Sequence, residues 1–228
     1  MTGAEALPPP IPAATVVLVR DGADGLETLM LHRTSKVAFG GMWAFAGGRI
    51  DPDDAADGRS EQDAARHAAV REAREEADLA CDADALVPFA HWVPPPIVAR
   101  RYATWFFVAP APPGAVTVDG GEIHDSAWMR PVDALARRDA QEIELAPPTW
   151  MTLRYLADFP DVAGVVADAS SRPPTFYETH IAHDGTGAMY ALWAGDAGYD
   201  SGDADAPGAR HRLLMSADRW LLDRRGLG

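Results

Sequence analysis

The fold of this chain is decided by residues 71–79, which read Arg71-Glu72-Ala73-Arg74-Glu75-Glu76-Ala77-Asp78-Leu79. At 100° per residue in a helix, Glu72, Glu75 and Glu76 fall within an arc of about 100° on one face. Three carboxylates on one face repel one another, so the helix needs a neutralising partner. A hard divalent cation such as Mg²⁺ or Mn²⁺ prefers oxygen ligands and would neutralise them. The alternative is a solvated helix in which Arg71 and Arg74 pair with the glutamates.

The sequence before this stretch predicts how the helix begins. Ser60 and Asp63 form an S-x-x-D start, a variant of the capping box, and the residues that follow are rich in alanine, glutamate and arginine. We therefore expect a helix over residues 61–79. Further upstream, residues 43–48 indicate a short apolar strand that ends in a glycine pair, and residues 51–60 indicate a solvated loop.

In this strand, loop and helix setting the chain resembles the Nudix hydrolases, whose motif runs G-x5-E-x7-R-E-U-x-E-E-x-G-U with U a bulky apolar residue. The positions that match the motif, in chain order, are Gly48, Arg71, Glu72, Glu75, Glu76 and Leu79. Ala73 is a small substitute at the first U. The resemblance implies a Nudix α/β/α sandwich with a mixed central sheet.

The match departs from the motif in three respects. Arg71 follows Gly48 by 23 residues where the motif has 14, so the loop carries a nine-residue insertion. Counting back from Arg71 puts Asp63 at the first glutamate of the motif, whereas counting forward from Gly48 puts Asp54 there. Asp78 replaces the glycine that ends the helix, and aspartate tolerates a left-handed backbone better than most residues.

Segments outside the motif resemble one branch of the family. Residues 32–35 and 40–48 are similar to the segment before the motif in coenzyme A diphosphatases, although F-A-G-G replaces the usual F-P-G-G. Residues 100–107 and 145–149 look like segments of the branch related to the peroxisomal coenzyme A diphosphatase, which generally has aspartate in place of Ala103. We expect a Nudix hydrolase domain over residues 12–145 and a C-terminal α+β extension over residues 146–228 packed on it.

The resemblance implies a metal-dependent hydrolase of a diphosphate linkage. Gly48, Glu72, Glu75 and Glu76 would form the metal site for Mg²⁺ or Mn²⁺, which neutralises phosphate charge and lowers the pKa of a bound water. Arg71 would pair with a carboxylate of the motif or a neighbouring backbone carbonyl and hold the helix in place. The catalytic residues expected from the resemblance are Glu72, Glu76, Glu122 and Arg71.

The general base is open between two residues at this stage. Glu122 lies in E-I-x-D-x-x-W, which looks like the late strand from which Nudix proteins often draw a further acidic residue, and Glu72 is the competing candidate. The candidates for binding the remaining phosphates of the substrate are Arg33, Lys36, Arg100 and Arg101. Arg100 and Arg101 are adjacent on a predicted strand and should point to opposite faces.

The resemblance leaves several substrates open. Coenzyme A or acyl-CoA is the leading candidate, with 3′,5′-ADP and a 4′-phosphopantetheine as products, and ADP-ribose or a nucleotide sugar is the alternative. A catalytically silent Nudix fold that binds a nucleotide and regulates a partner is a further alternative. Such a module would be expected to have lost glutamates of the motif, and all three are present here.

Composition excludes several other functions. Lysine and arginine total 20 against 34 aspartates and glutamates, and the formal charge of −14 disfavours binding to nucleic acid or to an anionic membrane. Cys81 is the only cysteine, which excludes an intramolecular disulfide. No apolar run approaches the ~20 residues of a membrane helix, and the amino terminus does not resemble a signal peptide. We expect a cytoplasmic protein with a small-molecule nucleoside diphosphate substrate, and leave a homodimer open.

Overall fold

The computed structural model describes residues 8–34, 40–97 and 100–226, and the chain divides into two compact units. Unit 1 consists of Met1–Ile11, Trp92–Ala103 and Phe176–Gly228, and unit 2 of Pro12–His91 and Thr104–Thr175. The helical segment that follows residue 146 belongs to unit 2. The predicted division into a Nudix domain over residues 12–145 and an extension over residues 146–228 stays a prediction.

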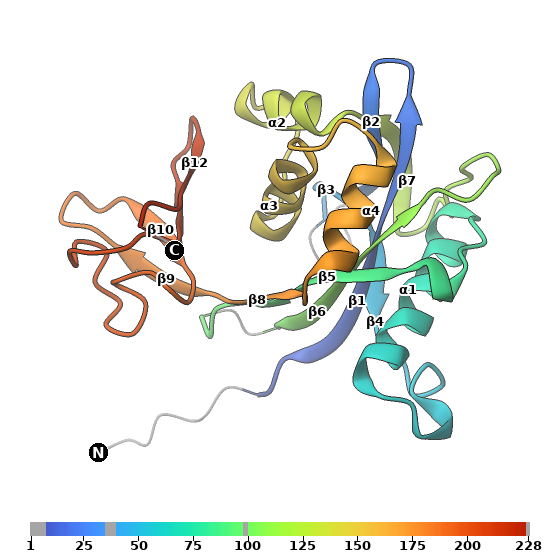
Figure 1. The fold of residues 1–228 in the computed structure, drawn as a ribbon, viewed down its shortest axis with the longest axis horizontal. Coiled ribbons are helices and arrows are strands. Elements are labelled where there is room, and N and C mark those ends of the chain that lie inside the picture. The colour runs from blue at the N-terminus through green and yellow to red at the C-terminus, as the bar shows by residue number, and fades with distance from the viewer. Residues whose placement is uncertain (1–7, 35–39, 98–99, 227–228) are drawn as a thin grey trace. The chain divides into compact units, whose positions relative to one another are not determined.

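An eight-stranded mixed sheet and four helices make up the larger part of the fold (Figure 1). The strands of this sheet are β1 (Ile11–Gly22), β2 (Gly25–Arg33), β3 (Trp43–Ala44), β4 (Ala46–Arg49), β5 (Val87–Val93), β6 (Tyr102–Pro110), β7 (Ile123–Met129) and β8 (Thr175–Glu178). The helices are α1 (Glu61–Ala77), α2 (Pro131–Asp139), α3 (Pro147–Leu156) and α4 (Val162–Ser171), with short 3₁₀ turns at Ala56–Gly58 and Ala83–Ala85.

The sheet has the strand order β3-β2-β1-β6-β5-β8, with β4 paired to β1 and β7 paired to β2. Strand β1 runs antiparallel to β2 and β4, and β2 runs antiparallel to β7. Strands β1 and β6 run in the same direction, because Ile11 donates to the carbonyl of Arg101 near their starts and Ala111 donates to the carbonyl of Val19 near their ends. The predicted mixed α/β fold is therefore confirmed.

Strand β1 explains why helices cover both faces of this sheet. Val16 and Leu18 pack in one cluster with the alanines of α1, while Val17 and Val19, which alternate with them, are also fully buried. Figure 1 shows α1 on one side of β1 and β4, and α2 and α3 on the other. The helix with the acidic residues is thus held against the strand that carries the glycine pair.

Several predicted elements have different bounds in the structure. The single strand predicted over residues 43–48 is two strands, β3 and β4, separated at Phe45. The sequence also indicates one strand over residues 175–181, and the structure has two. Strand β8 lies beside β5 in the eight-stranded sheet, whereas the residues from His180 onwards belong to a strand of a second sheet. The helix predicted over residues 61–79 ends two residues earlier, at Ala77.

Unit 1 contains a second sheet, four-stranded and antiparallel, in the order β12-β11-β10-β9. Its strands are β9 (His180–His183), β10 (Met189–Leu192), β11 (Arg212–Met215) and β12 (Trp220–Asp223). Residues 195–209 are rich in Gly, Asp and Ala, which indicates a loop. They are irregular but anchored, since Asp196 is buried and its carboxylate accepts hydrogen bonds from Arg212.

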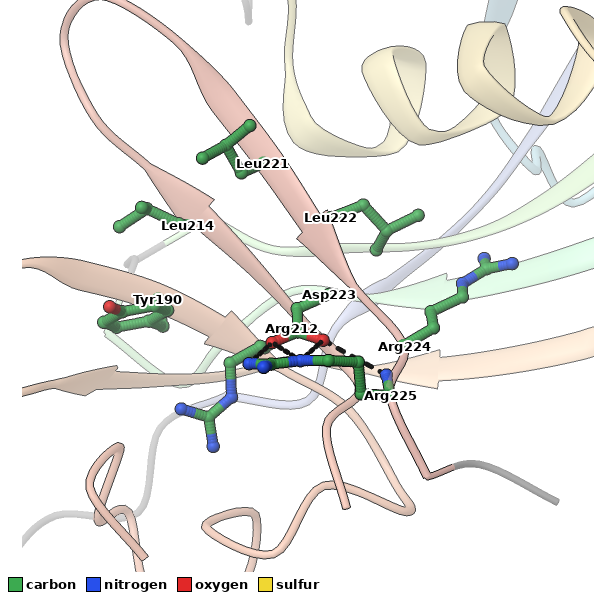
Figure 2. A pocket seen from close by; sticks show the side chains of 8 residues that line it. All are labelled: Tyr190, Arg212, Leu214, Leu221, Leu222, Asp223, Arg224 and Arg225. Carbon is green, nitrogen blue, oxygen red and sulfur yellow. Dashed lines mark hydrogen bonds and ion pairs between the residues drawn. The ribbon is translucent and has the colours of Figure 1, made fainter. Parts of the chain in front are cut away.

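A groove of about 570 Å³ lies on this sheet. Figure 2 shows the side chains that line it, with leucines beside arginines. Two of these arginines are neutralised by ion pairs, Arg212 with Asp196 and Arg225 with Asp223. The residues that line the groove are Tyr190, Arg212, Leu214, Leu221, Leu222, Asp223, Arg224 and Arg225.

Candidate active site

Helix α1 carries the acidic stretch, and both of its ends are capped. The Ser60 hydroxyl accepts a hydrogen bond from the amide of Asp63, as the capping sequence predicts. At the other end Asp78 has a left-handed backbone, with φ 56° and ψ 33°. Its amide donates to the carbonyl of Arg74, and the amide of Leu79 donates to the carbonyl of Ala73. Aspartate therefore ends the helix in the place of the motif's glycine, and the three glutamates stay within the last two turns.

Alanines bring α1 close to the sheet. Ala65, Ala69 and Ala73 are fully buried, and α1 packs mainly on β4. A methyl group projects less than other apolar side chains, so the helix backbone lies near the strand. The side chains of Glu72 and Glu76 can then reach the backbone of Gly47 and Gly48.

Glu76 is the most buried of the three glutamates, with only 5% of its side chain exposed. Its Oε2 accepts a hydrogen bond from the amide of Gly47 at 2.9 Å, and its Oε1 accepts one from Nη1 of Arg33 at 2.9 Å. Burial raises the pKa of Glu76 to about 7, although Arg33 and the Gly47 amide favour the charged form.

Glu72 lies directly against Gly48. A Cβ atom on Gly48 would lie 2.2 Å from Oε1 of Glu72, so only glycine leaves room for the carboxylate there. Burial also raises the pKa of Glu72, an effect that the hydrogen bond from Arg71 opposes and the charges of Glu75 and Glu122 reinforce. The acidic groups are therefore close enough to destabilise one another's charge.

Arg71 connects the helix to the loop before it. Its Nη1 donates to Glu72 at 2.8 Å and to Glu75 at 3.0 Å, and its Nη2 donates to Asp54 at 3.0 Å and to the carbonyl of Arg49 at 2.9 Å. Burial opposes the charge of Arg71, but the hydrogen bonds to Asp54 and Glu72 outweigh it and raise its pKa. Arg71 thus makes both kinds of contact predicted for it.

The same contacts settle which aspartate partners Arg71. Asp54 is buried, with 7% of its side chain exposed, and contacts Arg71, whereas Asp63 lies in the first turn of α1 and accepts a hydrogen bond from Ser60. Counting forward from Gly48 therefore gives the correct residue. The nine extra residues of the loop lie after Asp54, where the chain forms the 3₁₀ turn Ala56–Gly58.

Arg33 makes contacts that the sequence did not reveal. Its Nη1 donates to Glu76 and its Nη2 donates to Glu122 at 2.9 Å, so one guanidinium group bridges two acidic residues that are 46 positions apart. Glu122, predicted as a candidate base, is 58% exposed, and Glu75 is exposed to a similar extent. In the structure the guanidinium of Arg33 contacts these two carboxylates, and its predicted role in binding substrate phosphate stays a prediction.

The other predicted phosphate-binding residues are Lys36, Arg100 and Arg101. Lys36 lies outside the described residues. Arg100 and Arg101 belong to unit 1, where Arg100 lies over the ring of Tyr102 and Arg101 donates to the carbonyl of Pro8. Their role in substrate binding stays a prediction.

The acidic residues suit a hard divalent cation by their chemistry. Within residues 8–34, 40–97 and 100–226, no three acidic, histidine or cysteine side chains converge closely enough to enclose an ion, because Arg33 and Arg71 lie between the carboxylates. The carboxylates of Glu72 and Glu76 are nevertheless largely buried oxygen donors that destabilise each other's charge, and Gly48 makes room for that of Glu72. Mg²⁺ and Mn²⁺ prefer such donors, so the residues present fit these ions.

A mixed sheet lies between helices, and its glycine pair faces the acidic helix α1. Together with the family match over residues 9–149, this identifies an α/β hydrolase that acts on pyrophosphate bonds. Residues 9–149, more than half of the chain, match the family model described as NUDIX domain, and the chain belongs to the Nudix family. This family generally uses divalent cations such as Mg²⁺ or Mn²⁺.

Solved structures share the fold. The crystal structure of a NUDIX hydrolase from Alicyclobacillus acidocaldarius is 24% identical, with a TM-score of 0.64 over 71% of this chain and 97% of its own. The NUDIX domain of Shewanella oneidensis NrtR, determined in complex with ADP ribose, is 18% identical, with a TM-score of 0.50 over 67% of this chain and 90% of its own. No curated protein sequence matches the chain.

No helix in the described part of the chain has the length and apolar character needed to cross a membrane.

Proposed function

We propose that this Nudix protein hydrolyses the diphosphate linkage of a nucleoside diphosphate that is joined to another group. One observation carries the proposal: Glu76 and Glu72 are held against the glycine pair by the Gly47 amide and by the space at Gly48. Buried carboxylates that repel one another are retained where a cation offsets their charge. A diphosphate needs such a cation, because its own negative oxygens repel an incoming water.

Glu72, Glu75 and Glu76 would hold Mg²⁺ or Mn²⁺ next to Gly48. When bound, such an ion neutralises phosphate charge and makes hydroxide available near neutral pH. Arg71 would keep the helix and the preceding loop together through Asp54, and so fix the direction of Glu72. We favour Glu72 over Glu122 as the general base, since burial raises the pKa of Glu72 and Glu122 is largely exposed.

The substrate class follows from the branch resemblance and from the relatives. Coenzyme A and acyl-CoA are the first compounds to test, because residues 40–48 and 100–107 resemble the coenzyme A diphosphatase branch. ADP-ribose is the second, because the NrtR domain with the same fold was determined with that compound. Both contain an adenosine diphosphate joined to a second group, so one assay compares them directly.

We expect Glu76→Gln to abolish hydrolysis while leaving the protein folded. Glutamine keeps the size of the side chain and can still accept from Gly47, but it removes the negative charge, so we expect kcat/KM to fall by ~10³-fold or more. The measurement is product chromatography over a panel of coenzyme A, ADP-ribose and nucleotide sugars with Mg²⁺ and with Mn²⁺. Glu142→Gln on the surface of unit 2 is the matched control and should keep wild-type activity.

The outcomes separate an enzyme from a silent binding module. Turnover of one panel member by the wild type, lost in Glu76→Gln and kept in Glu142→Gln, would support the proposal. If no member is turned over and both variants bind the same nucleotides as the wild type, the protein is a regulatory module instead.

A further inference from the structure

Strand β12 lies at the end of the four-stranded sheet of unit 1. It pairs with β11 on one side, and no described strand pairs with its other side. Its sequence, Trp220-Leu221-Leu222-Asp223, contains neither proline nor lysine, the residues that commonly prevent a further strand from pairing with an edge. Leu221 is 45% exposed. The edge of β12 therefore offers a row of backbone amides and carbonyls to an added strand.

The groove on this sheet follows β12, because five of the residues that line it, 221–225, are consecutive in the chain. Leu214 on β11 is the Cα partner of Leu221, and Tyr190 on β10 is in turn the partner of Leu214. These side chains form an apolar row across three strands, and Leu214 and Leu221 lie side by side in Figure 2. An added strand would continue this row with apolar side chains of its own.

The segment around this edge is basic, although the chain as a whole is acidic. Residues 210–225 contain five arginines and two aspartates, a formal charge of +3 in a chain of −14. Arg212 and Arg225 are paired with aspartates. Arg224 is exposed and makes no ion pair with a described residue. An acidic segment that approaches β12 is therefore attracted, and a basic one is repelled.

The apolar row and the unpaired arginine lie on different sides of the strand. Arg224 directly follows β12 and stands three positions after Leu221, so the alternation of an extended chain directs their side chains to opposite faces. Figure 2 shows the two side chains pointing in different directions. A strand added here meets apolar side chains on one face and a positive charge on the other.

We propose that the edge of β12 and the groove beside it bind an extended segment of a partner protein in which acidic and apolar side chains alternate. The backbone of this segment pairs with β12 and adds a strand to the sheet of unit 1. Its apolar side chains lie next to Leu221, and its acidic side chains lie on the face of Arg224. This inference goes beyond the proposed function and does not depend on it.

The test is fluorescence polarisation of labelled peptides titrated with the full-length protein. The first probe is a peptide of about eight residues in which glutamate and valine alternate, and we expect it to bind. The second has lysine in place of glutamate and should bind at least ~10-fold more weakly, because its charge has the wrong sign. The third is the glutamate peptide with methylated amide nitrogens, which cannot donate to β12 and should also bind at least ~10-fold more weakly.

Charge reversal at the groove tests the position of the site. Arg224→Glu should weaken binding of the glutamate peptide by ~10-fold or more, because an attraction becomes a repulsion. Arg154→Glu is the matched control, since it reverses an exposed arginine on α3, and its affinity for the peptide should stay within about twofold of the wild type. Circular dichroism and the urea midpoint establish that both variants are folded.

Three results would overturn the proposal. The first is equal binding of the glutamate and lysine peptides, or absence of binding by both. The second is equal binding of the methylated and unmethylated peptides, which would exclude pairing with the strand edge. The third is a dimer of the wild type, measured by light scattering, that dissociates in Arg224→Glu, because a second copy of the chain would then cover this edge.

Discussion

At the scale of single residues, Gly47 and Gly48 are adjacent but are required for different reasons. A Cβ on Gly47 would lie 2.4 Å from the carbonyl oxygen of Ala14 and 2.8 Å from Cα of Thr15, both of them backbone atoms of β1. A Cβ on Gly48 would meet the carboxylate of Glu72 instead. Backbone cannot move without disturbing the sheet, whereas a side chain can rotate away.

This contrast predicts that Gly47→Ala damages the fold and Gly48→Ala damages the activity. We expect Gly47→Ala to lower the free energy of unfolding by ~1–3 kcal/mol through overpacking against β1. We expect Gly48→Ala to stay near wild-type stability but to lose ~10²-fold in kcat/KM, because a displaced Glu72 no longer has its working geometry. Urea unfolding and steady-state kinetics on both variants provide the measurement.

Gly41→Ala is not a suitable control for this pair, because Gly41 has a positive φ of 82°. Ala44→Gly, on the neighbouring strand β3, is the control: it removes a methyl group where the other two variants add one, and it lies outside the acidic cluster. Should Gly48→Ala lose stability as much as Gly47→Ala, the separation between fold and site drawn from these contacts would be wrong.

The sequence revealed the acidic residues but not their partners. Glu72, Glu75, Glu76 and Gly48 were found because the motif is local and its spacing is that of a helix. The bridge that Arg33 makes between Glu76 and Glu122 depends on the end of β2, helix α1 and the residue before β7 meeting, and no local pattern encodes that meeting. The sequence left Asp54 and Asp63 as two candidates for the first acidic position of the motif, because it does not show where in the loop the nine extra residues lie.

At the scale of elements, α1 was the best predicted part of the chain because its signals are local. Its start agrees with the predicted residue, and its end differs by two residues because Asp78 already has a left-handed backbone. The strands were less well bounded. Residues 43–48 read as one strand, and only the pairing of β3 with β2 and of β4 with β1 divides them.

The end of α1 gives a prediction on stability. Asp78 pays a steric cost for its φ of 56°, and glycine would not. We expect Asp78→Gly to raise the free energy of unfolding by ~0.5–1 kcal/mol, measured by urea denaturation followed by circular dichroism. The exposed ion pair of Asp78 with Arg74 contributes little and should not reverse the sign.

Asp78→Val is the opposing control and should lower the same free energy, since a β-branched side chain tolerates this backbone poorly. A loss of stability in Asp78→Gly would mean that the carboxylate, rather than the backbone, is what the helix end requires.

At the scale of the whole molecule, the division into two units could not be predicted from the sequence. Unit 1 is assembled from three separate chain segments, and Trp92, Tyr177 and Trp193 from two of these segments pack together in it. The predicted boundary at residues 145–146 instead treats the Nudix domain and the extension as two consecutive stretches of the chain. Which segments form one compact unit depends on contacts between residues far apart in the chain, and such contacts cannot be read from local sequence patterns.

Unit 1 has its own stabilising ion pair, between Asp196 and Arg212. Burial opposes the charge of Asp196, but hydrogen bonds from Arg212 and from the amides of His211 and Gly198 outweigh it and lower its pKa from 3.8 to about 2. Because the pKa in the folded state is the lower one, the stabilisation is complete above pH 4 and is lost as the pH falls towards 2.

We therefore expect Asp196→Asn to destabilise unit 1 at pH 7 by ~3 kcal/mol or more, since it leaves Arg212 buried without a charged partner. The difference from the wild type should shrink as the pH falls from 4 towards 2, where the wild-type carboxyl also becomes neutral. Urea unfolding of both proteins across this range, followed by tryptophan fluorescence, provides the measurement. A difference that stays constant with pH would contradict the role of the charge.

The buried alanines of α1 restrict which substitutions this enzyme can accept. The small methyl groups of Ala69 and Ala73 set the distance between α1 and the sheet, and so let Glu72 and Glu76 contact the glycine pair. A bulkier residue at Ala69 or Ala73 would move these carboxylates away from the glycine pair even if the domain still folded. Random mutagenesis aimed at new substrates should therefore spare this layer and vary the segments around it.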